Sequence, residues 1–170
     1  MKPTPKRRVD RSGIEIIRLC GDAIQRGGRI LVIGPENAHV ACEIAHALPE
    51  CGVVILGTPA SRGPAVDVIE RPANLHVLAC TIDGAHFLPC SIASVVASRH
   101  AILAPTNDIA TIAAWLVSRG ALIILDNDAH WRFWCRAVRL AMWTALRHAG
   151  DGALRLEHWR EPGVIVFRKR

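Results

Sequence analysis

The chain has 170 residues, of which 51% are hydrophobic and 21% are charged. This length and composition predict one globular domain, and they exclude a disordered chain and a small scaffold held only by disulfides. The longest apolar runs, such as residues 121–125, are far shorter than the roughly 20 residues that span a bilayer, so we expect no membrane partner.

The formal charge is +6, and much of the excess lies in residues 2–11 and 168–170. Such a balance is compatible with an anionic partner, but solvated tails are the simpler interpretation. No nucleic-acid-binding module accompanies the charge, so nucleic acid is not the favoured partner. Six cysteines without a C-x-x-C pair, and no signal sequence, predict reduced thiols and a cytoplasmic protein. We expect a basic tail over residues 1–12 and a single domain over residues 13–170.

Helical and strand patterns alternate along the chain. In chain order, the predicted strands are residues 29–34, 53–56, 75–80, 101–104, 121–125, 153–159 and 164–168. The predicted helices are residues 14–26, 38–48, 91–99, 108–119 and a long helix from residue 128 to about residue 148. Residues 62–71 are ambiguous.

This alternation predicts an α/β fold, because strand–helix–strand units build parallel sheets. The last two strands are joined by Glu161-Pro162-Gly163, a connection short enough to make them antiparallel. We therefore expect a mostly parallel seven-stranded sheet with a C-terminal antiparallel hairpin. Ligands of such sheets bind beyond the carboxyl ends of the strands, so the loops after the strands are the candidate site.

Three segments resemble a known family. Residues 30–57 contain a strand, a glycine loop, a helix, Ala-Leu-Pro and a second strand. Residues 120–131 contain a strand that ends in Asp-Asn, followed by an aromatic residue. Residues 83–89 contain Asp-Gly-Ala and Leu-Pro. With the element order, they resemble class I S-adenosylmethionine-dependent methyltransferases, nearest to the small catechol and caffeoyl-CoA O-methyltransferases. The resemblance implies a Rossmann-like methyltransferase fold, S-adenosylmethionine as cofactor, and methyl transfer to an oxygen of a small-molecule acceptor.

The resemblance assigns cofactor contacts to the loop after the first strand. Gly34 would let the backbone approach the methionine part of the cofactor, and Asn37 could donate to its carboxylate. Glu36 adds bulk and negative charge at the place of that carboxylate. A turn glycine at Gly34 and a helix cap at Asn37 are the simpler interpretations.

Two further loops complete the expected cofactor site. Asp83, followed by Gly84, corresponds to the family's acid that accepts from the adenine amino group; a plain loop acid is the alternative. Thr58 lies where the family has an acid that holds the ribose hydroxyls, and a hydroxyl is a weaker acceptor than a carboxylate.

Asp126 and Asn127 have the oxygen ligands that Mg²⁺ prefers, and the resemblance adds an aspartate after the fourth strand, for which Asp108 is available. A metal there would lower the pKa of an acceptor hydroxyl, with Asp126 and His130 as catalytic groups and His130 as general base. Helix caps and turn residues are the simpler interpretation of these acids, and a bystander role is the simpler one for His130.

Departures from the family pattern favour a second hypothesis, a catalytically inactive binding or interaction protein of the same fold. Val32 and Gly57 stand where the family has acids, and Pro35 removes a backbone donor from the glycine loop. A third hypothesis, an RNA methyltransferase or RNA binder, rests on charge alone. The chain has little material for a substrate lid, so we expect an open cleft, or a cleft that a second subunit completes in a homodimer.

Overall fold

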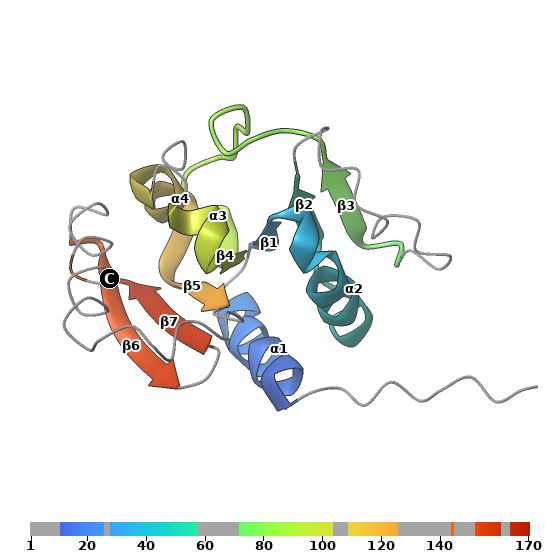
Figure 1. The fold of residues 1–170 in the computed structure, drawn as a ribbon, viewed down its shortest axis with the longest axis horizontal. Coiled ribbons are helices and arrows are strands. Elements are labelled where there is room, and N and C mark those ends of the chain that lie inside the picture. The colour runs from blue at the N-terminus through green and yellow to red at the C-terminus, as the bar shows by residue number, and fades with distance from the viewer. Residues whose placement is uncertain are drawn as a thin grey trace, which may run out of the picture.

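The computed structural model describes residues 11–25, 28–57, 72–103, 109–125, 144, 152–160 and 164–170. These residues form a seven-stranded sheet in the order β3-β2-β1-β4-β5-β7-β6 (Figure 1). Its strands are β1 (Arg29–Ile33), β2 (Val53–Leu56), β3 (Leu75–Leu78), β4 (Ile92–Ser98), β5 (Leu116–Leu125), β6 (Leu154–Arg160) and β7 (Val164–Lys169). The first five strands pair in parallel, and β7 pairs antiparallel with both β5 and β6. The expected mostly parallel sheet with a C-terminal antiparallel hairpin is confirmed.

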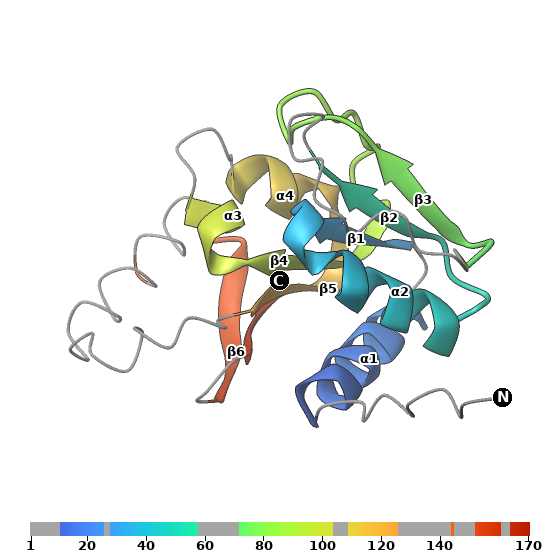
Figure 2. The ribbon, with the colours of Figure 1, turned by 45° about the vertical axis from the view of Figure 1, so that its right-hand side comes forward.

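Helices cover both faces of the sheet (Figure 2). The α-helices are α1 (Arg11–Ile24), α2 (Ala38–Ala47), α3 (Arg99–Leu103) and α4 (Ile109–Trp115), with a 3-10 turn at Pro35–Asn37. Leu31 and Ile33 pack with α3 and α4, whereas Ile30 and Val32 pack with α1 and α2. Side chains alternate between the faces of a strand, so a continuous apolar run supplies both cores, as in other parallel sheets. Within the described residues, no helix combines the length and the apolar character needed to cross a membrane.

The fourth strand lies earlier in the chain than the sequence pattern predicts. Residues 92–98 form β4 instead of a helix, and α3 replaces the strand predicted over residues 101–104. Ile92-Ala-Ser-Val-Val-Ala-Ser is apolar without a clear period, and burial on both faces between β1 and β5 decides for the strand. Ser98 then caps α3, because its Oγ accepts a hydrogen bond from the Ala101 N–H at 3.2 Å.

The next helix is also shorter than predicted. Helix α4 ends at Trp115 and β5 starts at once, so Gly120 lies inside a strand instead of closing a helix. The pairing of β4 with β5 jumps from Ile92↔Leu116 to Ser94↔Ala121, which makes residues 117–120 a bulge. A Cβ at Gly120 would lie 2.8 Å from the Val117 carbonyl oxygen, so close backbone approach requires glycine here.

Candidate functional site

The candidate site lies at the carboxyl ends of β1 and β4, where the order of the sheet reverses. Strand β1 pairs in parallel with β2 on one side and with β4 on the other. The chain adds β2 and β3 on one side of β1, and it then crosses back to add β4 and β5 on the other side. Such a switch point leaves a crevice that is the usual ligand site of an open α/β sheet.

Gly34 follows β1 directly and has a backbone that favours glycine. Its φ is 96° and its ψ is 130°, and its N–H donates to the Leu56 carbonyl oxygen at 3.0 Å. A Cβ at this position would lie 2.3 Å from Oε1 of Glu36, so the Glu36 carboxylate lies directly over Gly34. Pro35 packs against Gly57 at the end of β2, which holds the loop close to the neighbouring strand.

The Glu36 carboxylate also reaches across the switch point to β4. Ser98 donates a hydrogen bond through its Oγ to Oε1 of Glu36 at 2.6 Å. One hydroxyl therefore joins the loop after β1 to the start of α3. The Glu36 side chain is exposed, so it can rotate away from Gly34 if a ligand offers a better partner for its carboxylate.

Asn37 lies at the same loop, but its side chain is turned into the protein. It is 2% exposed, and its Nδ2 donates to the Ile33 carbonyl oxygen at 2.8 Å. Its backbone N–H donates to the Gly34 carbonyl oxygen at 3.1 Å. These two bonds fix the path of the chain from β1 into α2, because a buried amide strongly prefers partnered geometry.

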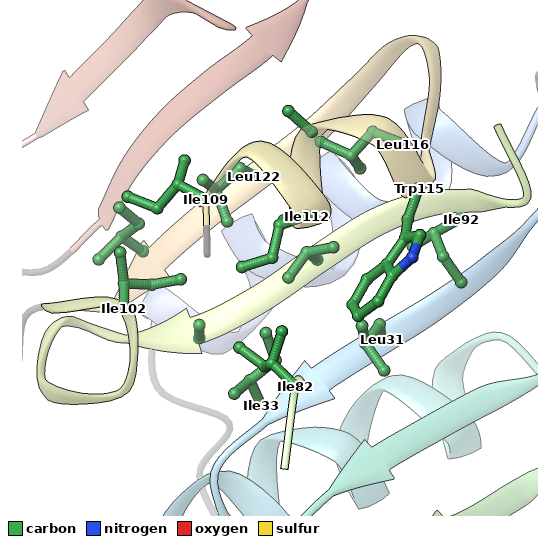
Figure 3. Packing of buried hydrophobic residues seen from close by; sticks show 14 of the residues in the cluster. Leu31, Ile33, Ile82, Ile92, Ile102, Ile109, Ile112, Trp115, Leu116 and Leu122 are labelled. Carbon is green, nitrogen blue, oxygen red and sulfur yellow. The ribbon is translucent and has the colours of Figure 1, made fainter. Parts of the chain in front are cut away.

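Asp83 and Gly84 are exposed in a turn between β3 and β4. The turn is closed by a bond from the Gly84 N–H to the Thr81 carbonyl oxygen at 3.2 Å. The residues on either side of the pair, Ile82 and Ala85, are buried in the cluster that includes Ile33, and Figure 3 shows Ile82 beside Ile33. The turn is therefore seated near the end of β1, on the side of the sheet that α3 and α4 cover.

The same segment is anchored a second time. The rings of Phe87 and Trp115 meet edge to face with centroids 5.0 Å apart, which ties it to α4. Loop residues held at two points can present Asp83 with little loss of conformational freedom on binding.

The other residues expected in the site are Thr58, Asp108, Asp126, Asn127 and His130, and they lie outside the described residues. Strand β4 ends at Ser98, however, so Asp108 does not directly follow the fourth strand, which was the reason for choosing it. Within the described ranges, no group of three or more His, Cys, Asp or Glu side chains could hold a metal ion.

Ser98 is the residue that sequence reasoning missed. Its signal was the rule that ligands bind beyond strand ends, but the rule was applied to residue 104 because the strand was misplaced. In the described part of the site, one carboxylate, one hydroxyl and a bare glycine backbone meet. This set can bind and orient a polar ligand.

No protein-family model matches the sequence, and no curated protein is detectably similar to it. Solved structures with a similar fold include precorrin-6y C5,15-methyltransferase from Geobacter metallireducens GS-15, with a TM-score of 0.62 and 13% identity, covering 99% of this chain and 93% of that chain. A variant of the 16S rRNA (adenine(1408)-N(1))-methyltransferase from Catenulisporales acidiphilia has a TM-score of 0.60 and 19% identity. The match covers 90% of this chain and 89% of that chain.

The mitomycin 7-O-methyltransferase MmcR has a TM-score of 0.62 and 16% identity over 92% of this chain. The chain spans 54% of the length of MmcR and 54% of the length of the S-adenosylmethionine-dependent methyltransferase SibL, another solved structure with a similar fold. Low identity with high coverage shows shared architecture. The chain therefore has the Rossmann-like fold of the class I S-adenosylmethionine-dependent methyltransferases.

Proposed function

We propose that the chain binds S-adenosylmethionine at the carboxyl edge of β1 and β4 and transfers its methyl group. The observation that carries the proposal is Gly34, a positive-φ glycine directly after β1, at the switch point of a sheet with the order of this fold. S-adenosylmethionine supplies an electrophilic methyl group on a positively charged sulfur. Methyl transfer depends mainly on positioning, so it needs few catalytic side chains.

The backbone of Gly34 can receive the cofactor only if the space over it is cleared. Glu36 fills that space with the far end of a flexible, exposed side chain, so the space opens when χ angles of Glu36 change. The displaced carboxylate then no longer covers Gly34, and the Ser98 hydroxyl is free to bind elsewhere. We assign Asn37 to holding the loop, because its amide already serves the Ile33 carbonyl.

The remaining cofactor contacts are proposed from the family resemblance. Asp83, next to Gly84, accepts from the adenine amino group, and its exposed carboxylate on an anchored turn supports this role. Thr58 follows Gly57 at the end of β2 and accepts from the ribose hydroxyls.

The acceptor that we propose is an oxygen of a small molecule, as in the catechol and caffeoyl-CoA type. In the metal-dependent form of this reaction, Asp126 and Asn127 would hold Mg²⁺, which would lower the pKa of the acceptor hydroxyl, and His130 would accept its proton. Methyl transfer to a catechol that stops in excess chelator and in Asp126→Ala selects this form. Transfer that is indifferent to chelator contradicts it.

A specific observation favours a second candidate, a binding protein of the same fold that has lost the reaction. The Glu36 carboxylate is hydrogen-bonded over Gly34, and Pro35 offers no N–H to a ligand. If this arrangement is permanent, the cofactor does not enter.

Calorimetric titration with S-adenosylmethionine and S-adenosylhomocysteine tests both candidates. We expect binding by the natural chain, weaker binding by Gly34→Ala, and unchanged binding by Gly152→Ala, a matched control whose φ is also positive but whose Cβ would meet nothing within 4 Å. Binding without transfer to any acceptor supports the second candidate. No binding by the natural chain or by Glu36→Ala overturns the proposal.

A further inference from the structure

A second charged surface lies away from Gly34, at the amino end of β5. Residues of β5, β6 and β7 line a groove of about 590 Å³, which we call the basic groove. Five of its lining residues are basic: Arg119, Arg155, Arg168, Lys169 and Arg170. One lining residue, Glu157, is acidic.

The basic groove is separate from the candidate site. Strands β1, β4 and β5 run in parallel, and Gly34 and Ser98 lie at their carboxyl end, whereas Arg119 precedes the part of β5 that pairs with β7. Strand β6 is the edge strand at the other end of the sheet from β3 (Figure 1). A ligand of the basic groove therefore does not contact Gly34 or Ser98.

Two arginines face each other across the hairpin that forms one wall. Arg155 of β6 is the direct cross-strand partner of Arg168 of β7, so both side chains emerge on the same face of the sheet. Like charges in directly opposed positions destabilise a strand pair. The pair therefore concentrates positive charge on one face of the hairpin.

Arg168 and Lys169 are held by partners within the protein. Arg168 forms an ion pair with Glu157, and Lys169 donates to the Leu116 carbonyl oxygen at 2.6 Å, beside the end of α4. Arg155 and Arg170 present exposed side chains at the groove. The groove is therefore positively charged toward solvent even with its ion pair formed.

Arg119 adds backbone strain to the same groove. It has a φ of 61°, in the left-handed region that side chains with a Cβ rarely adopt, and it lies in the β5 bulge. Glycine would fit this backbone better, yet the position carries an exposed arginine. Strain at a bulge that redirects a side chain is typical of functional positions.

We infer that the basic groove binds the phosphate backbone of a nucleic acid. Guanidinium groups match phosphate oxygens with two parallel hydrogen bonds, and arginines on three strands suit a polymer that passes several of them. A flat anionic membrane fits a concave groove poorly, and Leu156 is the one apolar side chain among its lining residues. From the sequence alone, the excess positive charge was assigned to solvated tails. The structure places part of it, at Arg168, Lys169 and Arg170, in the basic groove.

Fluorescence anisotropy of a labelled uridine oligonucleotide of about 20 nucleotides tests the inference on the full chain. We expect the logarithm of the affinity to fall as the logarithm of the salt concentration rises. The slope should be about −2, the value for three phosphates of a single strand neutralised by basic side chains of the groove. Arg155→Ser/Arg170→Ser should weaken binding about tenfold and reduce the slope by about 1.4. The matched control Arg18→Ser/Arg29→Ser removes the same charge at exposed positions outside the groove and should change affinity much less.

Arg119→Gly separates binding from folding. It should lower RNA affinity while the thermal stability stays the same or rises, because glycine relieves the backbone strain. Equal weakening by the groove and control double variants overturns the inference, as does binding that is lost only in Lys6→Gln/Arg7→Gln/Arg8→Gln. Competition by polyglutamate as effective as by RNA, or binding to anionic vesicles without binding to RNA, assigns the groove to another partner and also overturns it.

Discussion

Burial of the Cys20 thiol predicts a specific loss of stability at alkaline pH. Cys20 of α1 is completely buried beside the Ser94 hydroxyl of β4, and this burial raises the pKa of the thiol from 9.0 to about 12. Between these values the unfolded chain releases a proton that the folded chain retains. The stabilising contribution is therefore complete below pH 9 and declines as the pH rises toward 12.

The size of the effect follows from the same two values. Each pH unit between them costs about 1.4 kcal/mol, so the free energy of unfolding should be about 2 kcal/mol lower at pH 10.5 than at pH 8 because of Cys20 alone. The chain contains no Tyr, so no phenol titrates in this window.

Urea denaturation of the natural chain and of Cys20→Ala, measured at several pH values from 8 to 10.5, checks this prediction. Cys20→Ala should be less stable at pH 8, because it leaves a small cavity, but should lack the additional alkaline decline. Burial also raises the pKa of Cys51, which is less deeply placed, so Cys51→Ala should remove a smaller part of the decline. Parallel stability curves for the natural chain and Cys20→Ala would refute the reasoning.

Three further predictions concern single contacts. Asn74 donates through Nδ2 to the carbonyl oxygens of residues 45, 48 and 51 at 2.8–3.0 Å. In urea denaturation, Asn74→Ala should lower the free energy of unfolding by about 1–3 kcal/mol, and Asn74→Asp should lower it further because it places a carboxylate against those oxygens. Equal losses for the two variants would argue against the bonds. Gly28→Ala should lower the melting temperature far more than Gly152→Ala, because only at Gly28 would a Cβ meet backbone, 2.8 Å from the Ala93 nitrogen, and similar melting temperatures would contradict this. Lys169→Met should cost about 1–3 kcal/mol by removing the donor to the Leu116 carbonyl, and an unchanged free energy of unfolding would show that the contact is not formed in solution.

The fold was largely predictable because its parallel strands have simple local signals. Strand β2 has the predicted bounds, and β1 and α2 agree with prediction to within a residue, since glycines and Leu-Pro mark where each ends. Strand β4 was missed because Ala and Ser between valines suit a helix as well as a strand. Only its central place between β1 and β5, a tertiary property, decides for the strand.

The site was predictable in part for the same reason. Gly34 and Glu36 follow a correctly placed strand, and the structure brings them together. Ser98 follows the misplaced strand, and its bond to Glu36 joins residues 62 positions apart, which no local pattern encodes. The basic groove likewise depends on the β4–β5 bulge and on the Arg155↔Arg168 register, neither of which is visible before the strands are paired.

The central claim is that the backbone at Gly34 forms the floor of a cofactor site from which the Glu36 side chain can withdraw. Calorimetry of S-adenosylhomocysteine with Glu36→Ala and with Gly34→Ala measures this most directly. We expect the first variant to bind at least as tightly as the natural chain and the second to bind more weakly. Equal affinities for all three chains, or no binding by any of them, would contradict the claim.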